Sequence, residues 1–322
     1  MNAMKPTPLT EENLVESPRP HWVSRAAFPV LLAIFYLNEI AMGASLYLGY
    51  LWLAIPLVLI ASHLMHGILI GFHEASHGLL RKNRRLNEID GVIIGVLSFM
   101  SFSLYRAAHQ LHHAYLATER DVELWPFVIP GTPRWQRILA AILELTLGLF
   151  YGPFLFIRTF LRKGSPIRNK KLRGRIWTEF ALMAVVWCCI LGAVTWWGLW
   201  KYFLWMYLAP AFLAANMQNW RKYIEHVGLT GSTVNSSTRS IVSKGLLGRL
   251  VAFTLLHEPY HGVHHRHAGL PHAELPLFAS ELEPKRADEI SPFPSYRHAF
   301  VHLLRSLADP RAGAQWRTAT PP

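Results

Sequence analysis

The chain has 322 residues, of which 52% are hydrophobic and only 16% charged, and its 32 basic and 20 acidic residues give a net charge of +12. A typical soluble domain is about 25% charged, so this composition excludes intrinsic disorder and argues against an ordinary soluble enzyme. The two cysteines, Cys188 and Cys189, are adjacent, which excludes a disulfide framework, a zinc ribbon and an iron–sulfur cluster. With 17 histidines, any metal site must be built from imidazole.

The N-terminal part is predicted to be a cytoplasmic tail followed by a membrane-spanning hairpin. Residues 1–27 are polar and contain several prolines, and they lack the basic-then-apolar layout of a signal peptide. The apolar stretches 28–48 and 51–72 each match the ~20 residues that a helix needs to cross a bilayer. Only two residues separate them, so residues 28–72 are predicted to form a tight transmembrane hairpin.

The next segment, residues 73–175, is predicted to lie outside the bilayer or at its surface. Its apolar stretch 91–104 is too short to span a membrane and indicates a surface-lying or re-entrant segment. The stretch 136–160 is long enough, but Glu144, two glycines and Pro153 interrupt it. We therefore expect this second stretch to be interfacial.

A second transmembrane hairpin is predicted at residues 176–219, from apolar stretches at 176–197 and 200–219, and residues 220–322 form a C-terminal segment. Basic residues are concentrated between the two hairpins and nearly absent from the hairpin turns. By the positive-inside rule, the central segment and both termini are cytoplasmic. The predicted fold is an all-α integral membrane protein with four transmembrane helices in two hairpins and a cytoplasmic helical cap.

Histidines recur at fixed spacings near the predicted membrane boundaries. H-x-x-x-H occurs at 73–77, and H-x-x-H-H occurs at both 109–113 and 261–265. Histidines three or four residues apart share one face of a helix, where their nitrogens can bind one metal ion. A further histidine lies in Y-I-E-H-V-G at 223–228. The predicted metal ligands are His73, His77, His109, His112, His113, His226, His261, His264 and His265.

Two segments, 73–77 and 257–261, also match H-E-x-x-H, the pattern of zinc proteases. In the second copy, Pro259 would interrupt the helix that the motif requires. A catalytic zinc takes about three protein ligands, so the remaining histidines would be unused, whereas nine ligands suit two metal ions. A membrane zinc metalloprotease with its site at His73–His77, or a non-catalytic metal-binding or transport protein, are the alternatives from other classes.

The H-x-x-x-H and the two H-x-x-H-H boxes, the last behind a second predicted hairpin, resemble the membrane fatty acid desaturase superfamily. That superfamily is related to alkane hydroxylases and to carotenoid hydroxylases and ketolases. The resemblance covers residues 61–265, including the acidic continuation Thr118–Glu123, and 223–228 is similar to the extra histidine motif of alkane hydroxylases. It implies a non-haem di-iron centre held by the nine histidines, with O2 as co-substrate. It also implies an external electron donor, such as a ferredoxin with its reductase.

The preferred function is an O2-dependent oxidase that desaturates a lipid or fatty acyl chain, since an inert hydrocarbon calls for a metal-activated oxidant in a dry cavity. Alternatives within the family are a hydroxylase, a carotenoid oxygenase, or a decarboxylase that forms terminal alkenes, because all of these share the boxes. Chain length, head group and double-bond position are left open by the sequence. The expected partners are the bilayer, the lipid substrate and the electron donor, and no nucleic acid.

Three further residues are candidates for supporting the metal centre. Asp121 and Glu123 follow the second box and are predicted either to accept hydrogen bonds from ligand imidazoles or to form surface salt bridges with nearby arginines. The resemblance also implies an asparagine that holds a metal-bound water before the isolated histidine. Asn219 is the candidate, although its spacing from His226 departs from the family pattern.

Overall fold

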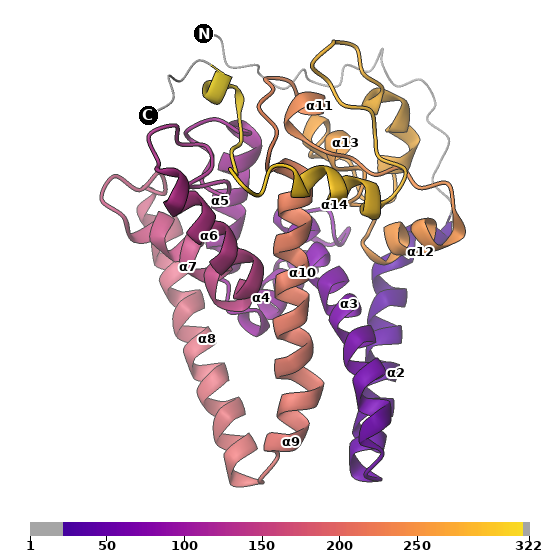
Figure 1. The fold of residues 1–322 in the computed structure, drawn as a ribbon. Helices are drawn as coiled ribbons and strands as arrows, with labels where there is room; N and C mark the ends of the chain where they lie inside the picture. The colour runs from indigo at the N-terminus through magenta and orange to yellow at the C-terminus, as the bar shows by residue number, and fades with distance from the viewer. Residues whose placement is uncertain (1–21, 318–322) are drawn as a thin grey trace.

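The computed structural model describes residues 22–317 (Figure 1), so most of the predicted tail at 1–27 lies outside the described residues. Within that range the chain is built from helices, and its β-interactions are two isolated bridges rather than strands. The all-α prediction is therefore confirmed. Three helices are long and apolar enough to cross a membrane: α2 (Ala27–Tyr47), α3 (Leu51–Ser76) and α8 (Lys170–Trp196).

Helices α2 and α3 follow the one-turn α1 (Trp22–Arg25) and pack against each other along their lengths (Figure 1). Their bounds agree with the predicted stretches to within a few residues. Gly49 makes the turn between them in the left-handed region, with φ of +79°, which glycine adopts without strain. The Asn38 side chain on α2 donates a hydrogen bond of 3.1 Å to the Leu57 carbonyl on α3, so this polar group is satisfied between the helices.

The region predicted as a second hairpin differs from a simple helix pair. After α8 and a turn at Gly198, the chain forms α9 (Trp200–Phe203), a π-helical stretch η2 (Leu204–Leu208) and α10 (Ala209–His226). The predicted span 200–219 is therefore three helical pieces, and its last turns carry polar residues. Helices α8 and α10 diverge from their shared turn (Figure 1), because α10 packs on α3 while α8 packs on α4 and α5.

The segment between α3 and α8 folds into two pairs of helices, and each pair has a break between its two members. Helices α4 (Arg84–Leu97) and α5 (Phe102–Ala114) are bent by 100° at their junction, as in a broken span or a re-entrant loop. A Cβ at Gly91 would lie 2.3 Å from Cζ of Phe102, so the two helices approach through a glycine. Helices α6 (Arg134–Thr146) and α7 (Gly148–Leu161) then occupy the stretch predicted as one interfacial segment, with a break at Leu147.

Two contacts fix the start of α5. Ser101 caps the helix by accepting a hydrogen bond from the Leu104 N–H. The buried carboxylate of Glu179, on α8, accepts hydrogen bonds from the Ser101 hydroxyl, the Ser103 N–H and the Ser103 hydroxyl at 2.6–2.9 Å. A carboxylate at this position also complements the helix dipole. The helix that carries the second histidine box is thus anchored to a long apolar helix.

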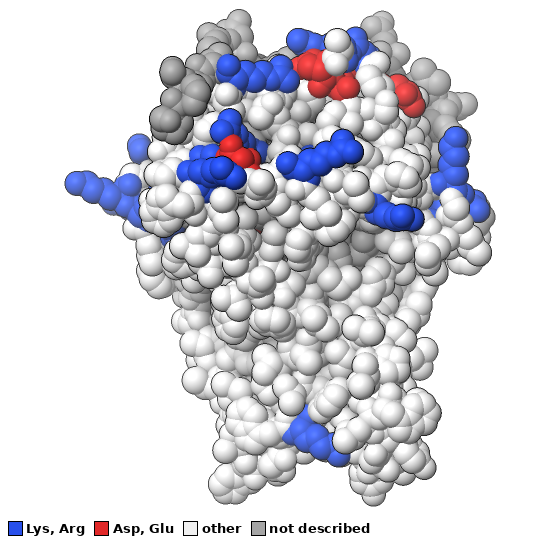
Figure 2. All heavy atoms as spheres, in the orientation of Figure 1, with Lys and Arg blue, Asp and Glu red and all other residues white. Residues whose placement is uncertain are grey.

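The C-terminal part forms short helices at the end of the molecule where α5 lies (Figure 1). They are α11 (Val234–Ser237), α12 (Leu246–Thr254), α13 (His261–Arg266), the 3₁₀-helix η3 (Leu275–Leu282), α14 (Tyr296–Leu304) and η4 (Ala314–Arg317). Charged residues gather at this end (Figure 2), whereas the long lower body is almost entirely uncharged. Apolar side chains there are exposed, such as Ile40 at 69% and Trp196 at 85%, which fits contact with lipid.

Candidate metal centre

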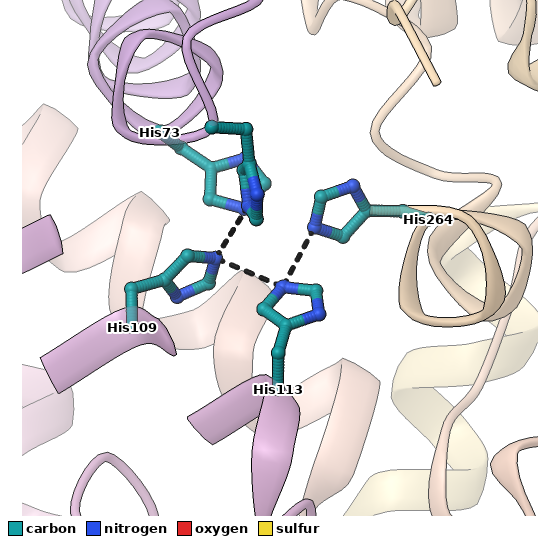
Figure 3. A group of neighbouring side chains, drawn as sticks. His73, His109, His113 and His264 are labelled. Carbon is teal, nitrogen blue, oxygen red and sulfur yellow. Dashed lines mark hydrogen bonds between the residues drawn. The ribbon is translucent and has the colours of Figure 1, made fainter. Parts of the chain in front are cut away.

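Five of the predicted ligands come together in a first cluster, which contains His73, His77, His109, His113 and His264. Figure 3 shows the rings of His73, His109, His113 and His264 converging from three parts of the chain, the end of α3, one face of α5 and α13. His109 Nε2 lies 3.0 Å from His77 Nε2 and 3.0 Å from His113 Nε2. His264 Nε2 lies 3.0 Å from His113 Nε2, which joins the two H-x-x-H-H boxes.

The other four predicted ligands form a second cluster beside the first. His112 groups with His226 and His265, and His261 Nε2 lies 2.8 Å from His226 Nε2 and 3.1 Å from His265 Nε2. The rings of His113 and His265 stack at a centroid distance of 4.4 Å, so the clusters are adjacent. All nine predicted residues therefore lie in two neighbouring groups of five and four.

The short nitrogen–nitrogen distances test whether a metal fits here. A neutral imidazole offers one N–H or one lone pair at Nε2, so it can form only one good hydrogen bond through that atom. His109 and His261 each have two Nε2 neighbours at 2.8–3.1 Å, more than hydrogen bonding satisfies. Two imidazoles at right angles on a metal, with bonds of about 2.0–2.1 Å, place their nitrogens about 3 Å apart. The donor set fits two metal ions.

Burial keeps His264 and His265 in the neutral form that binds metal. The pKa values of His264 and His265 on α13 lie well below the ordinary value, mainly because burial disfavours the charged ring and secondarily because other histidines surround them. Protons therefore compete weakly for the lone pairs near neutral pH.

Carboxylates contact the outward-facing nitrogens of several cluster histidines. Glu123 Oε1 lies 2.9 Å from His109 Nδ1, and Asp121 Oδ2 lies 2.8 Å from His112 Nδ1. Both acids are buried, at 8% and 1% exposure, and the side chains that they contact here are histidines rather than surface arginines. A carboxylate at Nδ1 holds the proton there and leaves Nε2 free for a metal.

Glu258 is a buried carboxylate that the sequence analysis did not assign to the centre. Its Oε1 lies 2.9 Å from His261 Nδ1 and 3.2 Å from Nη1 of Arg221, and its Oε2 lies 3.4 Å from His73 Nδ1. Arg221, on α10, is itself paired with Glu225 at 2.6 Å. The available signal was the glutamate of the second H-E-x-x-H, which was interpreted only as part of the zinc-protease pattern.

Two sequence expectations have specific outcomes. The Asn219 amide on α10 donates a hydrogen bond of 2.8 Å to the main-chain carbonyl of Glu144, so this side chain connects α10 to α6. In the second H-E-x-x-H, the chain from His257 to Tyr260 is a turn and α13 begins only at His261, as the argument from Pro259 predicts. The ring of His257 stacks instead on His272 at 6.0 Å.

Of the histidines outside the boxes, His63 Nε2 lies 2.8 Å from the Thr254 hydroxyl. His66 lies on the same face of α3 as His73 and is buried. Within residues 22–317, neither of its ring nitrogens has a hydrogen-bond partner. The structure does not place His66 in either cluster.

A cavity of about 530 Å³ leads to both clusters. Its walls are largely apolar and come from α2, α3, α4, α7 and α10, including Phe28, Leu32, Phe35, Leu69, Leu97 and Leu155. Its lining also includes members of both clusters, namely His73, His109, His112, His226 and His261. Volumes of about 300–1,000 Å³ with apolar walls and a few convergent polar groups are typical of ligand sites.

Comparison with known proteins agrees with this arrangement. The family model described as fatty acid desaturase matches residues 50–297, which include all nine clustered histidines. The chain is also similar to a curated protein named fatty acid desaturase from Bacillus subtilis (strain 168), with 25% identity over 259 residues, 74% of this chain and 71% of the relative. The family match covers most of the chain and implies an oxidoreductase that acts on lipid. The chain belongs to the fatty acid desaturase family.

Proposed function

We propose that this protein is an O2-dependent, di-iron membrane desaturase of an acyl chain. The observation that carries the proposal is the pair of histidine clusters that line a largely apolar cavity. When bound, two iron ions would supply the oxidation, using O2 and electrons from a separate donor such as a ferredoxin with its reductase. The five-histidine and four-histidine clusters would hold one ion each.

The cavity supports a hydrocarbon substrate. Its walls include Phe28 and Leu32 of α2, Ile93 and Leu97 of α4, and Phe156 of α7. These side chains offer no hydrogen-bonding groups, so they would exclude water and hold an extended apolar chain by shape. Ile93 and Leu97 are also partly exposed, at 52% and 43%, which would allow entry of the chain from lipid beside α4.

Side chains of this protein would position the reacting carbon and hold the ligand protons. Glu123 and Asp121 would keep the protons of His109 and His112 on Nδ1, because each acid lies within 2.9 Å of that nitrogen. Tyr105 stacks parallel to His109 with centroids 5.4 Å apart and lines the cavity. It would fix the His109 ring from the substrate side.

The membrane arrangement extends the proposal. Helices within residues 28–72 and 176–219 would lie in the bilayer, with 73–175 and 220–322 forming a cap at the cytoplasmic surface. The support is the concentration of basic residues at the cap end and the nearly uncharged face of the body below it (Figure 2).

Metal analysis and lipid profiling test the function together. The purified protein from iron-replete cells is expected to contain about two irons per chain. Cells that express it are expected to gain unsaturated acyl chains, detected by gas chromatography with mass spectrometry, relative to cells that express the His113→Ala, His265→Ala double variant. New hydroxyl groups or terminal alkenes in place of double bonds would move the assignment to a related reaction. One zinc per chain with little iron would contradict it.

A further inference from the structure

Glu258 lies between the two histidine clusters and contacts one member of each. Its Oε1 lies 2.9 Å from Nδ1 of His261, in the four-histidine cluster. Its Oε2 lies 3.4 Å from Nδ1 of His73, in the five-histidine cluster. The Glu258 side chain is fully buried. The two oxygens of one carboxylate therefore face two different metal sites.

Nδ1 of His73 and Oε2 of Glu258 are natural partners for each other. His73 Nδ1 and Glu258 Oε2 are each buried, and neither has another hydrogen-bond partner within residues 22–317. Leaving such groups unpaired away from water costs free energy. When Nε2 of His73 serves a metal, its proton lies on Nδ1, and Glu258 Oε2 is in place to accept it.

The protein holds Glu258 in place from two directions. Nη1 of Arg221 lies 3.2 Å from Glu258 Oε1, and the same guanidinium group is fixed by Glu225 at 2.6 and 2.7 Å. The backbone leading to Glu258 is strained, because Leu256 and His257 both lie in the left-handed region, with φ of +50° and +56°. Two consecutive residues other than glycine in that region are costly, and such strain is typical of functional sites.

From these contacts we infer that Glu258 is a positioning residue shared by the two metal sites, one that orients a ligand in each and couples the affinities of the two ions. The inference rests on the proposed di-iron function. Glu123 provides the comparison, because its contact with His109 Nδ1 serves the five-histidine cluster. Asp121 and His112 make the equivalent contact in the four-histidine cluster.

Glutamine substitutions distinguish a shared carboxylate from an ordinary one. An amide keeps one acceptor oxygen but replaces the other with an NH2 donor. Glu123→Gln can still accept from His109, so both irons are expected to stay bound. Glu258→Gln can serve one cluster but presents N–H groups to the other, so one iron is expected to bind at least about tenfold more weakly. Glu258→Ala removes both contacts and is expected to weaken both ions, whereas Glu123→Ala is expected to weaken one.

The experiment measures iron per chain during titration with a chelator, together with Mössbauer spectra of the iron-loaded wild type and the four variants. We expect both iron sites to change in Glu258→Ala and one in Glu123→Ala. If Glu258→Ala changes one site only, the shared role is wrong. If that variant does not fold, Glu258→Gln decides, and spectra like those of Glu123→Gln overturn the inference. A wild-type protein without two irons would instead refute the proposed function, independently of Glu258.

Discussion

The two H-x-x-H-H boxes have the same spacing but different structural support. The box at 109–113 lies near the end of the 13-residue helix α5, whereas the box at 261–265 lies on α13, which has only six residues. The first is held by ordinary helix contacts, including the cap at Ser101 and the Glu179 carboxylate. The second comes directly after a strained turn. It is supported by a buried ion-pair network around Arg221.

The difference shows that equal spacing does not imply equal local stability. A helix of six residues forms few of its own hydrogen bonds and depends on tertiary contacts. The second box therefore relies on η3 and α11, on which α13 packs, and on Glu258, which Arg221 of α10 holds. The first relies on its own helix and on α4 and α8. We expect substitutions to separate these two kinds of support.

The largest effect is expected where the boxes meet. His113 and His264 come from different boxes and lie 3.0 Å apart in the five-histidine cluster. Replacing either by Ala removes a proposed ligand, so activity is expected to fall by at least about 100-fold, beyond the usual loss for an outer partner. Product analysis by gas chromatography and iron content measure it. Full activity in either variant would contradict the assignment of that histidine.

A buried charge behind the second box, on α10, gives the next effect. Arg221→Met leaves the buried carboxylates of Glu225 and Glu258 uncompensated, which is expected to cost about 3–5 kcal/mol in the free energy of unfolding. Arg106 on α5 pairs with the partly exposed Glu88, and its replacement by Met is expected to cost less. Denaturation in detergent, followed by circular dichroism, compares them. Equal losses would mean that both boxes depend on their arginines alike.

Close glycine contacts test the packing behind each box. An alanine Cβ at position 91 would lie 2.3 Å from the Phe102 ring at the start of α5, and one at 262 would lie 2.8 Å from the Leu282 side chain behind α13. Gly91→Ala and Gly262→Ala are expected to destabilise the protein by about 1–3 kcal/mol, with the greater loss at 91.

Gly174→Ala is the matched control, because this helical position on α8 has open space around it. It is expected to raise stability by about 0.5–1 kcal/mol. Thermal unfolding of the three variants gives the order. A gain in stability at position 91 would show that α4 and α5 are not as tightly packed there.

A pH dependence of stability, similar in size to the glycine effects, is expected from two histidines beside the second box. Burial lowers the pKa of His257 to about 4 and that of His272 to about 3. The unfolded chain, with an ordinary value of about 6.5, then binds more protons, so stability is full above that pH and falls as the pH drops toward 4. At pH 5.5 each histidine is expected to lower the free energy of unfolding by about 1.4 kcal/mol. His257→Gln should reduce the loss of stability between pH 7.5 and 5.5, and an unchanged loss would refute this origin.

Local patterns predicted much of the fold. The apolar stretches at 28–48 and 51–72 match α2 and α3 because the length of an apolar run and the turn at Gly49 are properties of the chain itself. The predicted span at 200–219 was less accurate, since a π-helical stretch and the packing of α10 on α3 depend on distant residues. The same holds for the break between α6 and α7.

The sequence by itself determined which histidines can act together within each box, because spacings of three and four residues place them on one helical face. It also determined that the lower body is apolar and that charge collects at the other end. Only the tertiary structure decided how the nine residues divide into groups of five and four, since His264 meets His113 across 151 positions of the chain. It also decided that Glu258 faces both groups. Helical periodicity specifies which face a side chain lies on, but packing between distant segments decides which faces meet.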